Sequence, residues 1–150
     1  MSQSLARLCV HLVFSTKHRE PFLHDLIRAD LHAYMATVLK NLGCPVLIIN
    51  SVKDHVHILL DLGRTISASA AVEEVKKSSS KWIKTQGVEL STFAWQAGYG
   101  AFAVSESNVA AVRKYIATQA EHHRKTSFQD EYRAFLTKHN ITFDERYVWD

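Results

Sequence analysis

Two histidines placed two residues apart in a hydrophobic stretch are the side chains of this chain best suited to chemistry. They lie in residues 54–60, DHVHILL, a composition that predicts a strand. Side chains alternate along a strand, so His55 and His57 would share one face. Two neutral imidazoles on one face can bind a divalent first-row metal ion. The same alternation allows two half-exposed histidines on a solvated face, so the pair alone leaves both interpretations open.

A tyrosine and a glutamine further along the chain have helical spacing. We expect a helix from about Asn108 to Arg124, with Val109, Val112, Ile116 and Ala120 as its core stripe. A neighbouring stripe, spaced by three and four residues, contains Tyr115 and Gln119. A half-buried tyrosine beside a polar residue is a common structural arrangement, so this stripe also has a non-catalytic interpretation.

Length and composition predict one globular domain over residues 1–150. Apolar residues make up 47% and charged residues 22% of the 150, and the formal net charge is +3, which permits a nucleic-acid partner. No apolar run approaches the ~20 residues of a membrane span, and the start of the chain does not resemble a signal peptide. We therefore expect a cytoplasmic protein in which Cys9 and Cys44 are free buried thiols.

Periodicity and turn residues predict strands alternating with helices. The expected order is strand, helix, a strand hairpin, helix, strand and helix, followed by one final helix. Strands are expected at 5–14, 45–52, 55–60 and 93–104. Helices are expected at 25–42, from a cap at Thr65 or Ser67 to about Lys84, at 108–124 and at 126–139. For the final helix, Thr126 and Gln129 fit a capping box.

Four cations are candidates for contacts with phosphate groups on charge and position alone. Lys17 and Arg19 lie in a polar loop, whereas Lys77 and Lys81 lie on one side of an expected helix with serines between them. Ordinary solvated surfaces have the same composition. The chain has no phosphate-binding glycine loop, CxxC pair or GxSxG motif, which argues against nucleotide hydrolysis, zinc ribbons and common serine hydrolases.

Four motifs in this order resemble the single-tyrosine transposases of the HUH endonuclease superfamily. They are HLVFSTK at 11–17, DHVH at 54–57, WQAGYGAFAVS at 95–105, and YIATQ at 115–119 followed by His122 and His123. The resemblance covers nearly the whole chain, and the ordered set is highly specific.

The resemblance implies an α+β fold in which helices pack on a ferredoxin-like antiparallel sheet. It also implies that His55, His57 and Gln119 are metal ligands and that Tyr115 is the nucleophile. Attack by Tyr115 on DNA would leave a 5′-phosphotyrosine link and a free 3′-OH, so cutting and rejoining need no nucleotide cofactor. We expect Mg²⁺ as the ion, with Mn²⁺ able to substitute. Single-stranded DNA with hairpins and a second copy of the chain are the expected partners.

The sequence leaves three other functions open. The protein could be a non-catalytic binder of DNA hairpins, which would have no need for Tyr115 or the histidines. It could be a metal-dependent phosphodiesterase that uses water in place of Tyr115. A replication initiator or relaxase of the same superfamily is the third, although the small size and the lone tyrosine helix near the C-terminus favour a transposase.

Overall fold

A four-stranded antiparallel sheet forms the centre of the protein, in a computed structural model that describes residues 2–150. The strands are β1 (Cys9–Ser15), β2 (Val46–Ser51), β3 (His55–Asp61) and β4 (Gly100–Ala103). Their order is β2-β3-β1-β4. The two strands of the expected hairpin, β2 and β3, do pair, and β1 lies centrally with Val13 opposite His57. Together with its helices, the sheet has the predicted α+β, ferredoxin-like arrangement.

Alternation along the two central strands divides the sheet into two faces of different chemistry. Leu12, Phe14, Val56, Ile58 and Leu60 enter one hydrophobic core with the first two long helices. Cys9, Val13 and Leu59 enter two smaller clusters on the opposite face. Because His55 and His57 have the parity of Leu59, they belong to this second face.

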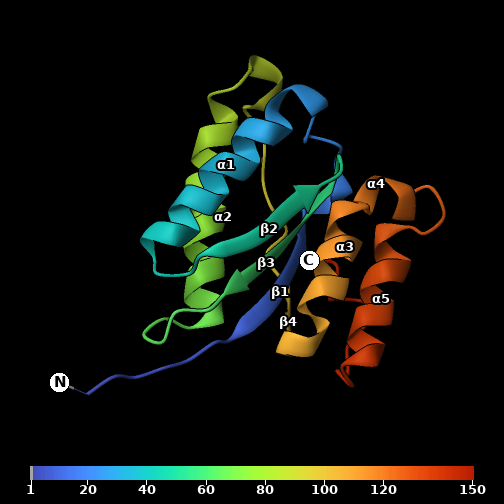
Figure 1. Cartoon of the computed structure of the whole chain (residues 1–150). Coiled ribbons are helices and arrows are strands. Elements are labelled where there is room, and N and C mark those ends of the chain that lie inside the picture. Colours follow the sequence, from blue (N-terminus) through green and yellow to red (C-terminus); the bar gives the residue numbers. More distant parts are fainter. Residues whose placement is uncertain (1) are drawn as a thin grey trace.

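Helices cover both faces of the sheet (Figure 1). On the first face lie α1 (Asp25–Asn41) and α2 (Ala68–Lys84), and Ser67 begins α2 by accepting a hydrogen bond from the amide of Ala70 at 3.1 Å. On the second face lie α3 (Val109–Ala117), α4 (Gln119–His122) and α5 (Phe128–Lys138). Short 3₁₀ turns occur at Lys17–Arg19, Val88–Leu90 and Glu106–Asn108. No helix among residues 2–150 is long and apolar enough to cross a membrane.

The strand expected at 93–104 was predicted too long, since only Gly100–Ala103 pairs as a strand. The Lys76 ammonium donates to the carbonyl oxygens of Gln96 and Gly98, at 2.8 and 2.6 Å. These carbonyls therefore accept from a side chain, whereas in a strand they would accept from a neighbouring strand. Gly100 is required for β4 to pack against α5, because a Cβ at this position would lie 2.7 Å from the Tyr132 ring of α5.

The single helix expected over 108–124 is divided in two at Thr118. The Thr118 hydroxyl donates to the carbonyl of Lys114 at 2.9 Å and lies 3.0 Å from Nε2 of His122, and its backbone leaves the helical region at φ −104°, ψ 26°. Such side-chain bonds compete with the helical ladder. The final helix also starts differently from the prediction, since Ser127 caps it through the Asp130 amide at 3.2 Å and Thr126 lies outside it.

Gln96 holds the end of β1 next to the histidine strand, and this contact generates a stability prediction. Its Oε1 accepts from the buried Ser15 amide at 2.8 Å, and Ser15 lies opposite His55 in the sheet. We expect Gln96→Ala to lower the free energy of unfolding by about 1–3 kcal/mol, because the amide loses its partner. Urea denaturation followed by circular dichroism measures the change.

Gln86→Ala is the matched control, because Gln86 is exposed and bonds only within its own turn. Its effect should stay within about 0.5 kcal/mol. Equal losses in the two variants would contradict the role assigned to Gln96.

Candidate active site

Both histidines of the strand motif are fully buried, with exposed fractions of 0%. They extend from β3 toward the face that α3, α4 and α5 cover, and the His55 ring stacks on Phe128 with 4.5 Å between centroids. A solvated pair is thereby excluded.

The outer nitrogen of each histidine has a polar partner. His55 Nδ1 lies 2.7 Å from the Asp54 carboxylate, and His57 Nδ1 lies 2.8 Å from Nε2 of His11. Burial, and then the neighbouring His57, lower the pKa of His11 to about 3, so His11 is neutral. Outer partners of this kind fix the ring orientation of metal-binding histidines, and here they leave both Nε2 atoms facing inward.

Two residues from outside the predicted set complete a cluster around these Nε2 atoms. His123, just after α4, brings its Nε2 to 2.9 Å from that of His55. Glu131 of α5 places Oε1 2.9 Å from His57 Nε2 and Oε2 3.3 Å from His123 Nε2. One ligand atom from each of His55, His57, His123 and Glu131 lies within 4.8 Å of all the others. This buried set fits a divalent metal ion, since imidazole and carboxylate both suit first-row metals.

The charges in the cluster are strongly coupled. Burial would raise the pKa of Glu131, but hydrogen bonds from His123, His55 and His57 hold it well below its ordinary value, so the carboxylate is ionised. Burial lowers the pKa of His57 to about 4. At His55 burial also acts to lower the pKa, but the Asp54 and Glu131 carboxylates outweigh it and raise the pKa. The ionised Glu131 carboxylate therefore faces the neutral His57 and the more readily protonated His55. A bound metal cation would stabilise this carboxylate.

Tyr115 lies beside this cluster and is joined to it by one hydrogen bond. Its hydroxyl donates to Oε2 of Glu131, its ring centroid is 6.0 Å from that of His57, and the ring stacks on His122 at 4.3 Å. Burial, with the hydrogen bond and charge of Glu131, raises the pKa of the phenol. Tyr115 is therefore held protonated, with its oxygen directed at the metal-binding group.

Gln119 is buried next to the cluster but contacts it through His123. Its Oε1 lies 3.0 Å from His123 Nε2, and its Nε2 donates to the Tyr115 carbonyl at 3.3 Å. It is thus placed both to orient His123 and to approach a metal ion.

His123 and Glu131 are the site residues that sequence reasoning missed. The His122–His123 pair was a recognisable signal without an assigned role. No sequence pattern pointed to Glu131. Its position depends on the turn between α4 and α5, and the sequence pattern does not determine the geometry of that turn. Of the two adjacent histidines, only His123 faces the cluster.

The four predicted DNA-binding cations lie in two different places. Lys17 and Arg19 follow the end of β1, where the amide of Thr16 bonds to the carbonyl of Asp54 at 2.8 Å, so they are near the site. Lys77 and Lys81 belong to α2 on the opposite face of the sheet, and Lys77 forms an ion pair with Glu74 at 3.0 Å. The structure therefore does not bring α2 to the cluster.

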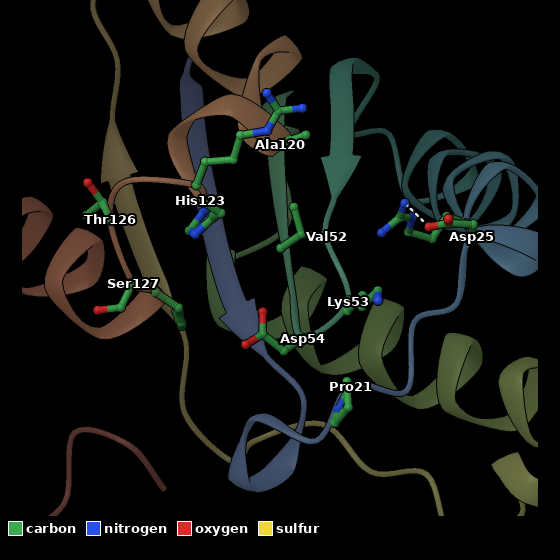
Figure 2. Close-up of a pocket in the computed structure, with 12 residues that line it drawn as sticks. Pro21, Asp25, Val52, Lys53, Asp54, Ala120, His123, Thr126 and Ser127 are labelled. Carbon is green, nitrogen blue, oxygen red and sulfur yellow. Dashed lines mark hydrogen bonds and ion pairs between the residues drawn. The ribbon is translucent and has the colours of Figure 1, made fainter.

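Two open cavities reach the cluster through different residues of it, and Thr126 lines both. The larger, of about 940 Å³, is called here the His123 cavity and lies between the start of α1, the β2–β3 turn and the segment from α4 to α5 (Figure 2). Its lining includes Asp54, His123 and Phe128. The smaller, of about 270 Å³, is called the Tyr115 cavity, and Tyr115, His122, Glu131, Phe135 and Lys138 line it.

Comparisons with known proteins identify the family and support the fold. Residues 4–119 match the model of a family described as IS200-like transposases. A transposase candidate from Deinococcus radiodurans R1 has a similar crystal structure, with a TM-score of 0.62, 22% identity, and coverage of 79% of this chain and 98% of that one. A REP-associated tyrosine transposase bound to a REP hairpin gives a TM-score of 0.58 and 15% identity, over 82% of this chain and 74% of that one. No curated protein matches the chain at a significant level.

The cluster predicts which side chains determine metal affinity. In Mn²⁺ titrations by calorimetry, we expect His123→Ala and Glu131→Ala each to weaken binding at least tenfold, because each removes a donor atom from the buried set. Gln119→Ala should have a smaller effect if Gln119 acts by orienting His123.

His139→Ala is the control, since His139 lies just after α5 and bonds only to the Phe135 carbonyl. If Gln119→Ala abolished Mn²⁺ binding while His123→Ala and Glu131→Ala bound it normally, the ligand set would instead be His55, His57 and Gln119.

The buried neutral imidazoles also predict how stability depends on pH without metal. The lowered pKa values of His11 and His57 mean that the unfolded chain takes up protons near pH 6.5 and the native state does not. Their stabilisation is complete above pH 6.5 and is lost as the pH falls. His55 has a raised pKa and changes its contribution only above pH 6.5. In chelator, these two histidines together should lower the free energy of unfolding by about 3 kcal/mol from pH 6.5 to 5.

His11→Gln tests the source of this slope, because a glutamine can still bond to His57 Nδ1 but does not titrate. Its denaturation series should show a shallower decline over the same range. An unchanged slope would show that other groups cause the acid destabilisation.

Proposed function

The chain belongs to the IS200-like transposase family, and from this premise we propose that it cuts and rejoins single-stranded DNA through Tyr115. One observation carries the proposal. The Tyr115 hydroxyl donates to Glu131, and Glu131 contacts the inward nitrogens of His57 and His123. A nucleophile is thus coupled to a metal-binding cluster within one chain.

His55, His57, His123 and Glu131 would hold the metal ion, and Gln119 is the alternative ligand that the family resemblance implies. A bound divalent ion neutralises negative charge on the scissile phosphate and orients it. Because the donor set is rich in imidazole nitrogen, Mn²⁺ should bind more tightly than Mg²⁺, which prefers oxygen ligands. Mg²⁺ remains the proposed ion in the cell on the resemblance alone.

Tyr115 supplies the attacking oxygen in the proposed reaction. A bond forms between its phenolic oxygen and phosphorus while the bond from phosphorus to the 3′-oxygen breaks. Glu131 Oε2, which already accepts the phenolic hydrogen bond, is placed to receive the proton as the bond forms and to pass it to solvent, and the released 3′-oxygen takes up a proton from solvent to become a hydroxyl. The phosphotyrosine retains a phosphodiester bond, so a 3′-OH can reverse the step and join a new strand.

The proposed substrate is single-stranded DNA that carries a hairpin. This is supported by the family and by the likeness in fold to a tyrosine transposase bound to a REP hairpin. The resemblance also implies a homodimer, which we retain as a proposal. Tyr115 and the histidine pair meet within one chain, so each subunit would have a site of its own.

The test of this proposal is covalent capture of DNA. Wild-type protein and Tyr115→Phe are incubated with labelled single-stranded DNA from both flanks of the coding gene, with Mn²⁺, Mg²⁺ or chelator, and run on denaturing gels. We expect a metal-dependent adduct with wild-type protein and at least a 1,000-fold loss with Tyr115→Phe, because phenylalanine has no oxygen to attack phosphorus.

Tyr147→Phe is the matched control, since Tyr147 is 64% exposed in the C-terminal tail, and its adduct yield should equal that of wild type. Cleavage that survives Tyr115→Phe and forms no adduct would instead indicate a phosphodiesterase that uses water. Tight hairpin binding with neither cleavage nor adduct would indicate a non-catalytic binder.

A further inference from the structure

Two cavities that meet the cluster at different residues give the site a direction. Tyr115 and Glu131 line the smaller cavity, whereas Asp54, His123 and Phe128 line the larger one. The metal-binding atoms lie between them, because Glu131 contacts His57 and His123, and Asp54 and Phe128 contact His55. Tyr115 therefore approaches the metal-binding atoms from one cavity and His123 from the other, and the two cavities also adjoin at Thr126.

Displacement at phosphorus adds a geometric requirement. The attacking and leaving oxygens lie roughly in line on opposite sides of the phosphorus atom. The attacking oxygen comes from Tyr115, on the side of the smaller cavity, so the leaving 3′-oxygen faces the His123 cavity. The strand that ends in that 3′-oxygen, upstream of the scissile phosphate, must leave the cluster through this side.

The exposure of the cluster agrees with this direction. The side chains of His55 and His57 are fully buried and that of Glu131 is 4% exposed, but that of His123 is 14% exposed. His123 faces the larger cavity beside Asp54 and Ser127 (Figure 2). Among the four cluster residues, the one most open to solvent therefore lies on the side assigned to the upstream strand.

The charges of the His123 cavity suit a phosphate backbone. Its cations are Arg28, Lys53 and Arg124. Its two acids are already engaged, since Asp25 pairs with Arg28 and Asp54 with His55. Within residues 2–150, Lys53 and Arg124 form no ion pair with a carboxylate.

The rest of the lining suits nucleotides. The hydroxyls of Thr126 and Ser127 can bond to phosphate or base edges, and Pro21 and Val52 offer apolar contacts. The volume, about 940 Å³, lies at the upper end for small-molecule pockets and leaves room for more than a single phosphate group.

We propose that the His123 cavity binds the nucleotides immediately upstream of the scissile phosphate, with Lys53 and Arg124 as their phosphate contacts. The inference rests on the proposed function and adds to it an orientation of the DNA strand. The downstream strand, which becomes attached to Tyr115, leaves on the side of the Tyr115 cavity.

Photocrosslinking tests the orientation directly. Tyr115→Phe protein is bound, with Mn²⁺, to single-stranded oligonucleotides that carry 4-thiothymidine at one of the three positions upstream or downstream of the cut, and crosslinked peptides are mapped by mass spectrometry. Upstream probes should crosslink at Lys53, Arg124, Ser127 or Phe128, and downstream probes within 130–138, whereas Thr126 lines both cavities and does not discriminate between them. The reverse pattern, or crosslinks to the same peptides from both sides, would overturn the proposal.

Kinetics on substrates with different numbers of upstream nucleotides test the roles of Lys53 and Arg124 while Tyr115 is intact. We expect Lys53→Ala combined with Arg124→Ala to raise the KM for adduct formation at least tenfold on a substrate with five upstream nucleotides. With one upstream nucleotide, the same variant should differ from wild type by less than twofold. An effect independent of upstream length would contradict the assignment.

Lys40→Ala is the matched control, because Lys40 is an exposed cation in the last turn of α1, about 18 Å along the helix from Arg28. It should leave KM unchanged on both substrates. Failure of the proposed function would be distinguishable, because wild-type protein would then form no Tyr115 adduct on any substrate.

Discussion

The contact of one buried carboxylate with three imidazoles is the interaction on which the second face of the sheet depends. Glu131 is almost fully buried against His55, His57 and His123. An isolated charge in such a place would cost several kcal/mol, so it persists only with partners of complementary charge or hydrogen bonding. The contact therefore constrains where α5 can lie, because the carboxylate and the imidazoles are both satisfied only when the helix directs Glu131 at β3.

The remaining polar groups on this face are satisfied through the same chain of contacts. His57 bonds outward to His11, His55 to Asp54, and His123 to Gln119. Among residues 2–150, no buried side-chain nitrogen or oxygen lacks a hydrogen-bond partner. A polar network that is fully satisfied holds its members in one arrangement, which is what a site with a directed nucleophile requires.

The parts that could be predicted from the sequence follow from short-range periodicity. Alternation in residues 54–60 predicted that His55 and His57 share a face, and the sheet and long helices follow the expected order. The parts missed depend on contacts between distant segments. Glu131 reaches β3 only because Thr118 interrupts the helix and Ser127 starts the next one, and the family match ends at Gln119, before both missed residues.

Two adjacent histidines of one short segment make two different contacts in the site. Adjacent side chains on a regular helix diverge by about 100°, and here His122 stacks on the Tyr115 ring while His123 turns to the cluster. Gln119, one turn before His123, bonds to its Nε2 and to the carbonyl of Tyr115. The tyrosine helix and the metal-binding histidine are therefore connected through a single amide side chain. A change at Gln119 would alter both the position of His123 and the support of the nucleophile, so the importance of this glutamine does not by itself identify it as a metal ligand.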